Sequence, residues 1–295
     1  MSIRHLLNIS DLSATELRHV LNLSTNHGTP LSGLGVALIF EKPSNRTRHS
    51  MEMAVVQLGG HPVYTRGEEV GLDVRESVED VTKILGGYHA IIAARVFKHS
   101  FVERMAAVSS VPVINMLSDW SHPLQALADV FTMEEKIGSL SGKTIAWVGD
   151  YNNVARSLGE AVCLLGGVFS LGCPTDYSAS NMELARLEAL GGSVTQTQDP
   201  NAAVQGAHVV HTDTWISMGQ EEESSVRRTV FGAFMVTEEL MAQADPAAFF
   251  MHCMPAHRGE EVSAAVMDGP RSLVITQGHH RMTAARGALA FVMGG

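Results

Sequence analysis

Four short segments of this 295-residue chain combine residue types that bind anions or amines. The first is Phe40-Glu41-Lys42-Pro43-Ser44-Asn45-Arg46-Thr47-Arg48, which follows an apolar run and opens a predicted helix. Ser44 is a typical N-cap residue, and a helix start offers unpaired N–H groups and the positive end of the dipole. Arg46 and Arg48 add guanidinium groups that match phosphate oxygens. The segment predicts a phosphate site; a capped surface helix with solvated arginines is the alternative.

The second segment, Ser121-His122-Pro123-Leu124-Gln125, also lies between a predicted strand and a predicted helix. His122 and Gln125 are three residues apart on the first helical turn, so they face the same way, and both can donate or accept hydrogen bonds. Such a pair suits a carbonyl oxygen and an amide-like NH₂ group. A capping or packed histidine is the alternative interpretation.

The third segment is Asp213-Thr214-Trp215-Ile216-Ser217-Met218-Gly219-Gln220-Glu221, just past the predicted strand His208–Thr212. Ligands of open α/β sheets bind beyond the carboxyl ends of the strands, where Asp213 can meet an ammonium group. The stretch from Ser217 is predicted to be a loop, and Gln220–Arg228 a movable lid. An ordinary solvated loop is the alternative.

The fourth segment is His252-Cys253-Met254-Pro255-Ala256-His257-Arg258-Gly259-Glu260-Glu261, at the end of the predicted strand Phe249–Cys253. A thiol near His and Arg side chains is typical of a reactive cysteine. Metal binding by His252, Cys253 and His257 lacks a second Cys/His pair at a usual spacing, and an inert buried cysteine is a further alternative. A separate turn, Gly149–Asn153, lacks the GxGxxG pattern, so a dinucleotide site is poorly supported.

Strands and helices alternate along the whole chain. The predicted strands are Gly35–Phe40, His61–Tyr64, Ala90–Val96, Val111–Leu117, Thr144–Val148, Val168–Gly172, Ser193–Thr197, His208–Thr212 and Phe249–Cys253. Predicted helices include Arg46–Leu58, Val78–Leu85, Pro123–Ile137 and His279–Met293. This alternation predicts an α/β fold of two domains, each a parallel sheet flanked by helices. The small-residue stretch Gly138-Ser139-Leu140-Ser141-Gly142 is the predicted boundary.

Composition narrows the class of protein. Apolar residues make up 45% and charged residues 18% of the chain, which is typical of a globular protein. A net charge of −10 without a basic block argues against nucleic acid or an anionic membrane as partner. The three cysteines form no CxxC pair, and neither a signal peptide nor a membrane span is evident. We therefore expect a cytoplasmic enzyme.

The order of the four segments resembles the ornithine carbamoyltransferase family. SxRTR after a strand, HPxQ near the middle, D-x-W-x-S-M-G-Q-E later and HCMPAHRG near the end extend the resemblance from Phe40 to Arg281. The first two motifs are shared with aspartate carbamoyltransferases, and the last two belong to the ornithine branch.

The resemblance implies a domain of residues 1–137 that binds carbamoyl phosphate and a domain of residues 138–278 that binds L-ornithine. The last helix, 279–295, packs back on the first domain. The implied assembly is a homotrimer in which a loop of one subunit completes its neighbour's site. The implied reaction carbamoylates the δ-amine of L-ornithine, giving L-citrulline and phosphate, and it needs no metal and no organic cofactor.

Site residues follow by matching the family's motifs. The implied phosphate contacts are Ser44, Asn45, Arg46, Thr47 and Arg48, and the carbamoyl contacts are Arg95, His122 and Gln125. The implied ornithine contacts are Asn153, Asp213, Ser217 and Met218. Cys253, Met254 and Arg281 close the site. Arg95, His122, Asp213 and Cys253 are the implied catalytic residues.

Four positions depart from the family pattern. Asn45 stands where Thr is usual, and Gly71 where the neighbour-reaching loop often carries Gln. Leu124 replaces a common Cys, and the run Gln277-Gly278-His279-His280-Arg281 lacks the usual acidic stretch before the arginine. The alternatives left open are a carbamoyltransferase for putrescine or an acylated ornithine, a nicotinamide dehydrogenase, and a non-catalytic binding protein.

Overall fold

The computed structural model describes residues 3–216 and 221–295 and shows two compact units. Unit 1 comprises Met1–Ala128 with His279–Gly295, and unit 2 comprises Asp129–Gly278. The chain passes between them inside two continuous helices, α6 (Pro123–Ile137) and α13 (Val274–Val292). The boundary between the compact units falls inside α6, at Asp129, and the predicted stretch from Gly138 follows the end of that helix.

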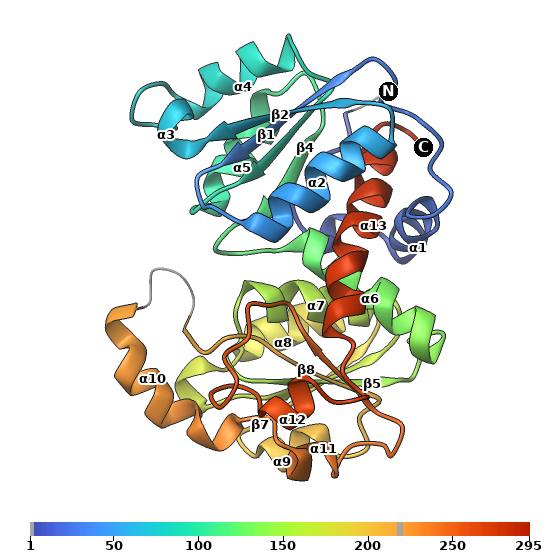
Figure 1. Cartoon of the computed structure of the whole chain (residues 1–295), viewed down its shortest axis with the longest axis vertical. Helices are drawn as coiled ribbons and strands as arrows, with labels where there is room; N and C mark the ends of the chain where they lie inside the picture. The colour runs from blue at the N-terminus through green and yellow to red at the C-terminus, as the bar shows by residue number, and fades with distance from the viewer. Residues whose placement is uncertain (1–2, 217–220) are drawn as a thin grey trace. The chain divides into compact units, whose positions relative to one another are not determined.

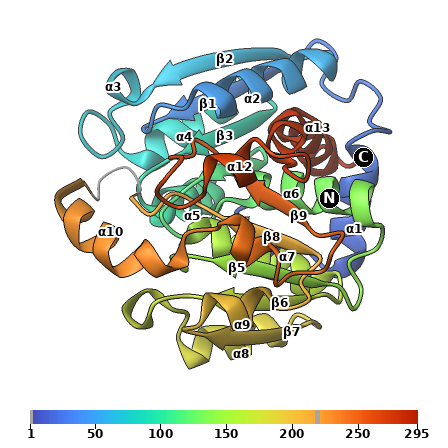
Figure 2. The same cartoon turned by 60° about the horizontal axis from the view of Figure 1, so that its bottom comes forward.

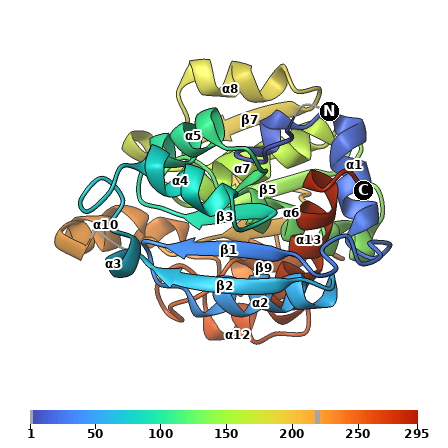
Figure 3. The same cartoon turned by 90° about the horizontal axis from the view of Figure 1, so that it is seen from above.

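Unit 1 is built on a four-stranded parallel sheet of order β2-β1-β3-β4. Its strands are β1 (Gly35–Phe40), β2 (His61–Arg66), β3 (Ile91–Arg95) and β4 (Val113–Leu117). Its helices are η1 (Ile9–Asp11), α1 (Ala14–Leu23), α2 (Asn45–Gln57), α3 (Gly67–Val70), α4 (Val78–Gly86) and α5 (His99–Val108). Figures 1 and 3 show α2 on one face of the sheet and α4 and α5 on the other. The two central strands are accordingly apolar and buried along almost their whole length.

The C-terminal helix belongs to unit 1 from His279 onward, as the resemblance implied. It begins at Val274, earlier than the predicted His279. Gly287 lets it approach α1 closely, since an added Cβ would stand 2.3 Å from the carbonyl oxygen of Val20. This close approach brings the residues of α13 that precede Gly287, including Arg281, toward the core of unit 1.

Unit 2 is built on a five-stranded parallel sheet of order β7-β6-β5-β8-β9, seen in Figure 2. Its strands are β5 (Thr144–Val148), β6 (Val168–Gly172), β7 (Ser193–Thr197), β8 (Val209–Thr212) and β9 (Phe249–His252). Its helices are α7 (Asn153–Leu164), η2 (Thr175–Tyr177), α8 (Asn181–Glu188), α9 (Pro200–Val204), η3 (Glu221–Glu223), α10 (Ser224–Phe231), η4 (Gly232–Phe234), α11 (Glu238–Met241) and α12 (Ala264–Met267). In Figure 1, α7 and α8 cover one face, and α9, α11 and α12 cover the other.

Every predicted strand is confirmed. The largest differences are at β2, which ends at Arg66 instead of Tyr64, and at β4, which begins at Val113 instead of Val111. The two parallel sheets flanked by helices confirm the predicted fold class. Among the described residues, no helix is long and apolar enough to cross a membrane.

The strand order gives each sheet a topological switch point. In unit 1 the chain direction across the sheet reverses between β1 and β3, and in unit 2 it reverses between β5 and β8. Ligands of such sheets bind at these switch points, beyond the carboxyl ends of the strands. The segments after β1 and β3, and those after β5 and β8, therefore carry the residues to examine for function.

Candidate active site

The Thr47 hydroxyl is the centre of a buried polar cluster in unit 1. Ser44 caps α2, and its Oγ accepts the Thr47 N–H at 3.4 Å and donates to Thr47 Oγ1 at 3.1 Å. Arg281 Nη2 donates to the same Oγ1 at 3.1 Å, and Arg95 Nη1 approaches it at 3.5 Å. Arg281 Nη1 also donates to Gln125 Oε1. We call Ser44, Thr47, Arg95, His122, Gln125 and Arg281 the Thr47 cluster.

Burial makes this cluster unusual. Arg95 and Arg281 are only 6% and 5% exposed, although arginine is mostly a surface residue. They come from β3 and α13, and the contacts described above place both on one hydroxyl at the start of α2. Two buried guanidinium groups at a capped helix N-terminus form a preorganised site for an anion.

His122 is neutral in this setting. Burial lowers its pKa well below the ordinary value, and the positive charges of Arg281 and Arg95 lower it further. A neutral imidazole has one N–H to donate and one ring nitrogen to accept. The ring can therefore offer a hydrogen bond to a carbonyl oxygen without bringing a third positive charge into the cluster.

This lowered pKa predicts acid sensitivity of the folded state. Above pH 6.5 His122 is neutral in both the folded and the unfolded chain. Below pH 6.5 only the unfolded chain takes up the proton, so the free energy of unfolding decreases as the pH decreases. The contribution of this residue is at most about 1.4 kcal/mol per pH unit. Urea unfolding from pH 7.5 to pH 5 should show a shallower loss for His122→Gln than for the wild type. The same loss of unfolding free energy with decreasing pH in both proteins would refute a neutral, buried His122.

The other predicted phosphate residues lie on the first turn of α2. Asn45 is exposed, and Arg46 is half-buried. Arg48 is turned to other partners: its Nε donates to Glu52 Oε1 at 2.8 Å, and its guanidinium lies 3.8 Å from the centre of the Tyr64 ring. Of the two arginines proposed for phosphate, Arg48 is thus the one held by a carboxylate of its own helix.

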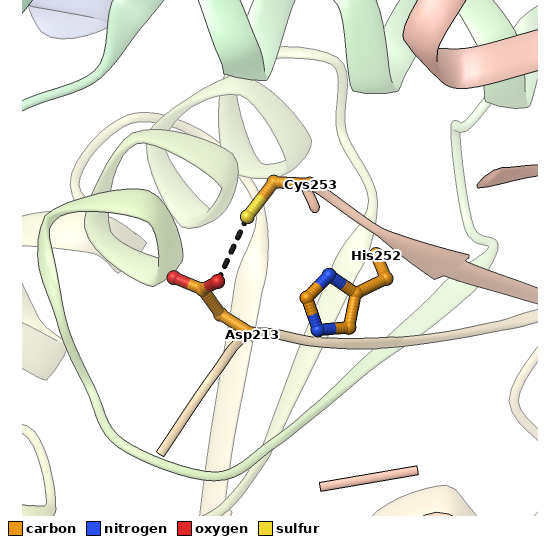
Figure 4. Close-up of side chains that lie close together, drawn as sticks. All are labelled: Asp213, His252 and Cys253. Atoms are coloured by element: carbon orange, nitrogen blue, oxygen red, sulfur yellow. Dashed lines mark hydrogen bonds between the residues drawn. The ribbon is translucent and has the colours of Figure 1, made fainter. Parts of the chain in front are cut away.

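Asp213 is the centre of a second cluster, in unit 2. Its Oδ2 accepts from Asn152 Nδ2 at 2.8 Å, and its Oδ1 accepts from the Thr214 N–H at 2.8 Å and from Cys253 Sγ at 2.9 Å. Figure 4 shows the thiol pointing at the carboxylate. The ends of β5, β8 and β9 are thereby joined around one carboxylate. We call Asn152, Asp213, His252 and Cys253 the Asp213 cluster.

His252 holds the backbone beside Cys253. Its Nδ1 accepts the Met254 N–H at 2.8 Å, and its Nε2 lies 3.2 Å from Glu261 Oε1. Met254 adopts a left-handed φ of 55°. Because both ring nitrogens are engaged, His252 is badly placed to serve as a metal ligand, although its atoms and those of Asp213 and Cys253 lie within 4.8 Å of one another. The donor set fits a hydrogen-bonded site better than a metal centre.

Asn152 is a member of this cluster that the sequence analysis did not single out. The resemblance implied Asn153, which is the first residue of α7, and the preceding Asn152 contacts Asp213. Asn152 is also the N-cap of α7, accepting the Val154 and Ala155 N–H groups at 2.9 and 3.0 Å. An Asn immediately before a predicted helix is the signal that identifies it.

Arg227 is a second missed residue. This 5% exposed side chain of α10 donates to Asp150 Oδ2 at 2.8 Å and to the Trp215 carbonyl at 3.0 Å. Burial raises the pKa of Asp150, and the bond from Arg227 opposes that rise. The pair joins the turn after β5 to the loop after β8. Ser217 and Met218, proposed for ornithine, lie outside the described residues.

The remaining cysteines have no place in either cluster. Cys163 and Cys173 are free and fully buried, and burial raises the pKa of the Cys163 thiol to about 12. They stay protonated and unreactive near neutral pH. Cys253 is half-buried and is the cysteine that contacts a site carboxylate.

Comparison with known proteins agrees with this geometry. Two family models match: the aspartate/ornithine carbamoyltransferase carbamoyl-P binding domain over residues 4–135, and the Asp/Orn binding domain over residues 141–292. The chain is 44% identical to the ornithine carbamoyltransferase of Hyperthermus butylicus, over 98% of this chain and 97% of that protein. It is 42% identical to the anabolic ornithine carbamoyltransferase of Pyrococcus furiosus, over 99% and 97%.

Solved structures are equally similar. The ornithine carbamoyltransferase structure from Pyrococcus furiosus has a TM-score of 0.95 at 41% sequence identity and covers 100% of this chain and 98% of that one. The family models together span nearly the whole sequence. The Asp213 cluster falls inside the second model, and the Thr47 cluster falls inside the first except for Arg281. This chain therefore belongs to the aspartate/ornithine carbamoyltransferase family.

Proposed function

We propose that this enzyme transfers the carbamoyl group of carbamoyl phosphate to the δ-amine of L-ornithine, giving L-citrulline and phosphate. The observation that carries the proposal is the pairing, in one chain, of two buried arginines on Thr47 with a carboxylate–thiol contact at Asp213. The first suits a phosphorylated acyl donor and the second an amine. The names of the relatives, ornithine carbamoyltransferases at more than 40% identity, support the same reaction.

The Thr47 cluster can serve the acyl donor. We assign Ser44, Asn45, Arg46 and Thr47 to the phosphate, which a helix N-terminus and guanidinium groups stabilise. Arg95, His122 and Gln125 are assigned to the carbamoyl group, and Arg281 to the donor as a whole. As the amine attacks the carbonyl carbon, the carbonyl oxygen becomes an oxyanion. Each donor aimed at it contributes roughly 10²–10³ in rate.

The reaction then completes by loss of phosphate. A C–N bond forms, the C–O bond to phosphate breaks, and the bonding pair leaves on the phosphate oxygen. The nitrogen loses one proton in the process. The arginines of the Thr47 cluster neutralise the departing charge, so no metal or organic cofactor has a step to perform.

The Asp213 cluster can serve the amine. An alkylamine has a pKa of about 10.4, so the site must bind the minor neutral form or remove a proton. We assign Asp213 to the α-ammonium group of ornithine and Cys253 to the side-chain end, with Met254 beside it. Asn152, Asn153, Ser217 and Met218 are assigned to the α-carboxylate. Since Cys253 already donates to Asp213 at 2.9 Å, an ammonium can take that place without leaving a carboxylate oxygen unsatisfied.

A direct assay tests the proposed function. Purified protein is incubated with carbamoyl phosphate and either L-ornithine, Nα-acetylornithine, putrescine or L-aspartate, and the carbamoylated product and phosphate are measured. Stoichiometric L-citrulline and phosphate with ornithine as the best acceptor is the expected result. Faster reaction of the acetylated amine or of putrescine would reassign the acceptor, and no transfer to any amine would reject the enzyme assignment.

Arg46 and Arg48 offer a matched pair on one helix. We expect Arg46→Ala to raise the KM for carbamoyl phosphate and lower kcat/KM roughly 10²-fold or more, because a guanidinium at the helix start faces phosphate. Arg48→Ala should cost less, since its guanidinium is already paired with Glu52 and stacked on Tyr64. Initial rates at varied carbamoyl phosphate measure both. A larger loss for Arg48→Ala would show that Arg48 leaves Glu52 to bind phosphate.

We also propose a homotrimer, as the family resemblance implied, that acts in the cytoplasm, as the composition led us to expect. The segment Glu68–Glu76 is the one expected to approach a neighbouring subunit, although Gly71 supplies no side chain there. Sedimentation equilibrium at assay concentration should give about three times the 31.7 kDa chain mass. A fully active monomer would contradict the assembly, and activity in the membrane or exported fraction of cells would contradict the location.

A further inference from the structure

The outer edge of β9 is closed by three different acceptors. β9 is the last strand of its sheet, so alternate N–H groups on its outer edge have no partner strand in the described residues. The Phe250 N–H donates to the Arg271 carbonyl at 2.9 Å, the His252 N–H to Gln277 Oε1 at 3.0 Å, and the Met254 N–H to His252 Nδ1 at 2.8 Å. The last two bonds lie on either side of Cys253.

Gln277 is the long-range member of this series. Its side chain is 1% exposed, and its oxygen must face the strand, because a backbone N–H can only donate. Its Nε2 therefore faces inward, where it donates to Asp129 Oδ1 at 2.6 Å and lies 3.0 Å from His211 Nε2. All of these groups belong to unit 2, and Asp129 and Gln277 stand close to the points where the chain enters and leaves it.

We propose that Gln277 is a positioning residue that sets the place of the Cys253 thiol, and that its side chain must be a neutral amide to do so. This inference rests on the proposed function. One end of the amide tethers the strand immediately before Cys253. The other end satisfies a fully buried carboxylate, which would otherwise lack this donor.

The charge requirement follows from the neighbours. The titratable groups around Gln277 within unit 2 are Asp129 on α6, His211 on β8 and His252 on β9, the last paired with Glu261. A carboxylate at position 277 would place an oxygen about where Nε2 now lies, 2.6 Å from an Asp129 oxygen. Two carboxylates at that distance cannot both ionise in a buried site, so they must share a proton.

The first experiment removes the tether. In Gln277→Leu we expect kcat to fall roughly ten-fold, with the KM for ornithine raised and the KM for carbamoyl phosphate unchanged. Alkylation of Cys253 by iodoacetamide, followed by peptide mass spectrometry without substrates, should accelerate several-fold. Gln243→Leu, at an exposed glutamine of the same unit, is the control. Wild-type kinetics and wild-type alkylation in Gln277→Leu would overturn the proposal.

The second experiment tests the charge and keeps the test decisive even where Gln277→Leu unfolds. Activity of Gln277→Glu relative to wild type should decline as pH rises from 6 to 9, because the shared proton is lost. Adding Asp129→Asn should make the ratio of variant to wild-type activity independent of pH again. A merely structural defect in Gln277→Glu would lower this ratio equally at every pH. A flat ratio in Gln277→Glu itself would overturn the charge requirement. Because alkylation of Cys253 needs no substrate, it reports on positioning even where citrulline formation fails in the wild type.

Discussion

Replacing Arg281 by Met should reduce kcat/KM for carbamoyl phosphate roughly 10²–10³-fold while leaving the fold intact. Arg281 reaches Gln125 with one terminal nitrogen and Thr47 with the other, and it is 5% exposed. The change removes a buried positive charge from the anion site and takes one hydrogen-bond donor from each of two polar partners. Its positive charge also lowers the pKa of His122, so in the variant the acid limb of the pH–rate profile should move to higher pH.

Two further substitutions serve as comparisons for Arg281→Met. Arg281→Lys keeps the charge but loses the two-pronged guanidinium, so its kcat/KM for carbamoyl phosphate should lie between those of Arg281→Met and the wild type. Arg286→Met lies further along α13, where the arginine donates to Gln57 at 2.7 Å at an exposed position, and it should leave the kinetics unchanged. Initial-rate kinetics measure kcat/KM for each variant, and thermal unfolding checks that each variant is folded. If Arg281→Met keeps kcat/KM within about three-fold, the cluster is structural and the donor binds elsewhere.

Asp213→Asn should abolish most of the preference for ornithine. The carboxylate suits an α-ammonium group through a charge-assisted bond and repels the additional carboxylate of aspartate. The amide removes this attraction and also sets its NH₂ against one of the donors Asn152 and Cys253, which contact the two carboxylate oxygens at 2.8 and 2.9 Å. Each buried polar group left unsatisfied costs about 1–3 kcal/mol, or roughly 5- to 150-fold in rate.

The measurement compares initial rates with ornithine, putrescine and aspartate at equal subsaturating concentration and saturating carbamoyl phosphate. We expect ornithine to be clearly preferred by the wild type and little preferred by Asp213→Asn. The control is Asp176→Asn, at an exposed aspartate of the same unit. An unchanged ornithine preference in the Asp213 variant would show that this carboxylate does not read the α-ammonium group, even where the carbamoyl phosphate assignment stands.

Burial explains how the Thr47 cluster can attract an anion although the whole chain carries a net negative charge. The net charge of −10 repels an anionic donor at long range, but salt screens exposed charges beyond about 10 Å. The guanidinium groups of Arg95 and Arg281 are buried and hydrogen-bonded, so they are screened much less. The local site therefore determines anion binding.

Much of this protein could be predicted from local sequence. Strands such as Gly35–Phe40 and Thr144–Val148 were predicted with their observed bounds, because a buried parallel strand is a short apolar run between turn residues. The N-cap at Ser44 and the position of Asp213 after β8 were also local signals. Their order along the chain was enough to predict the family.

Contacts between distant residues were decided only by the tertiary structure. Arg281 meets Thr47 across 234 positions and Gln277 meets Asp129 across 148, and neither spacing leaves a periodic trace in the sequence. The orientation of Arg48 toward Glu52 and Tyr64, and the contact of Asn152 with Asp213, depend on which way a side chain points from its helix. Sequence patterns specify which residues form an element and which face is apolar. Which polar atoms meet depends on how the elements pack, because a hydrogen bond tolerates only a few tenths of an ångström.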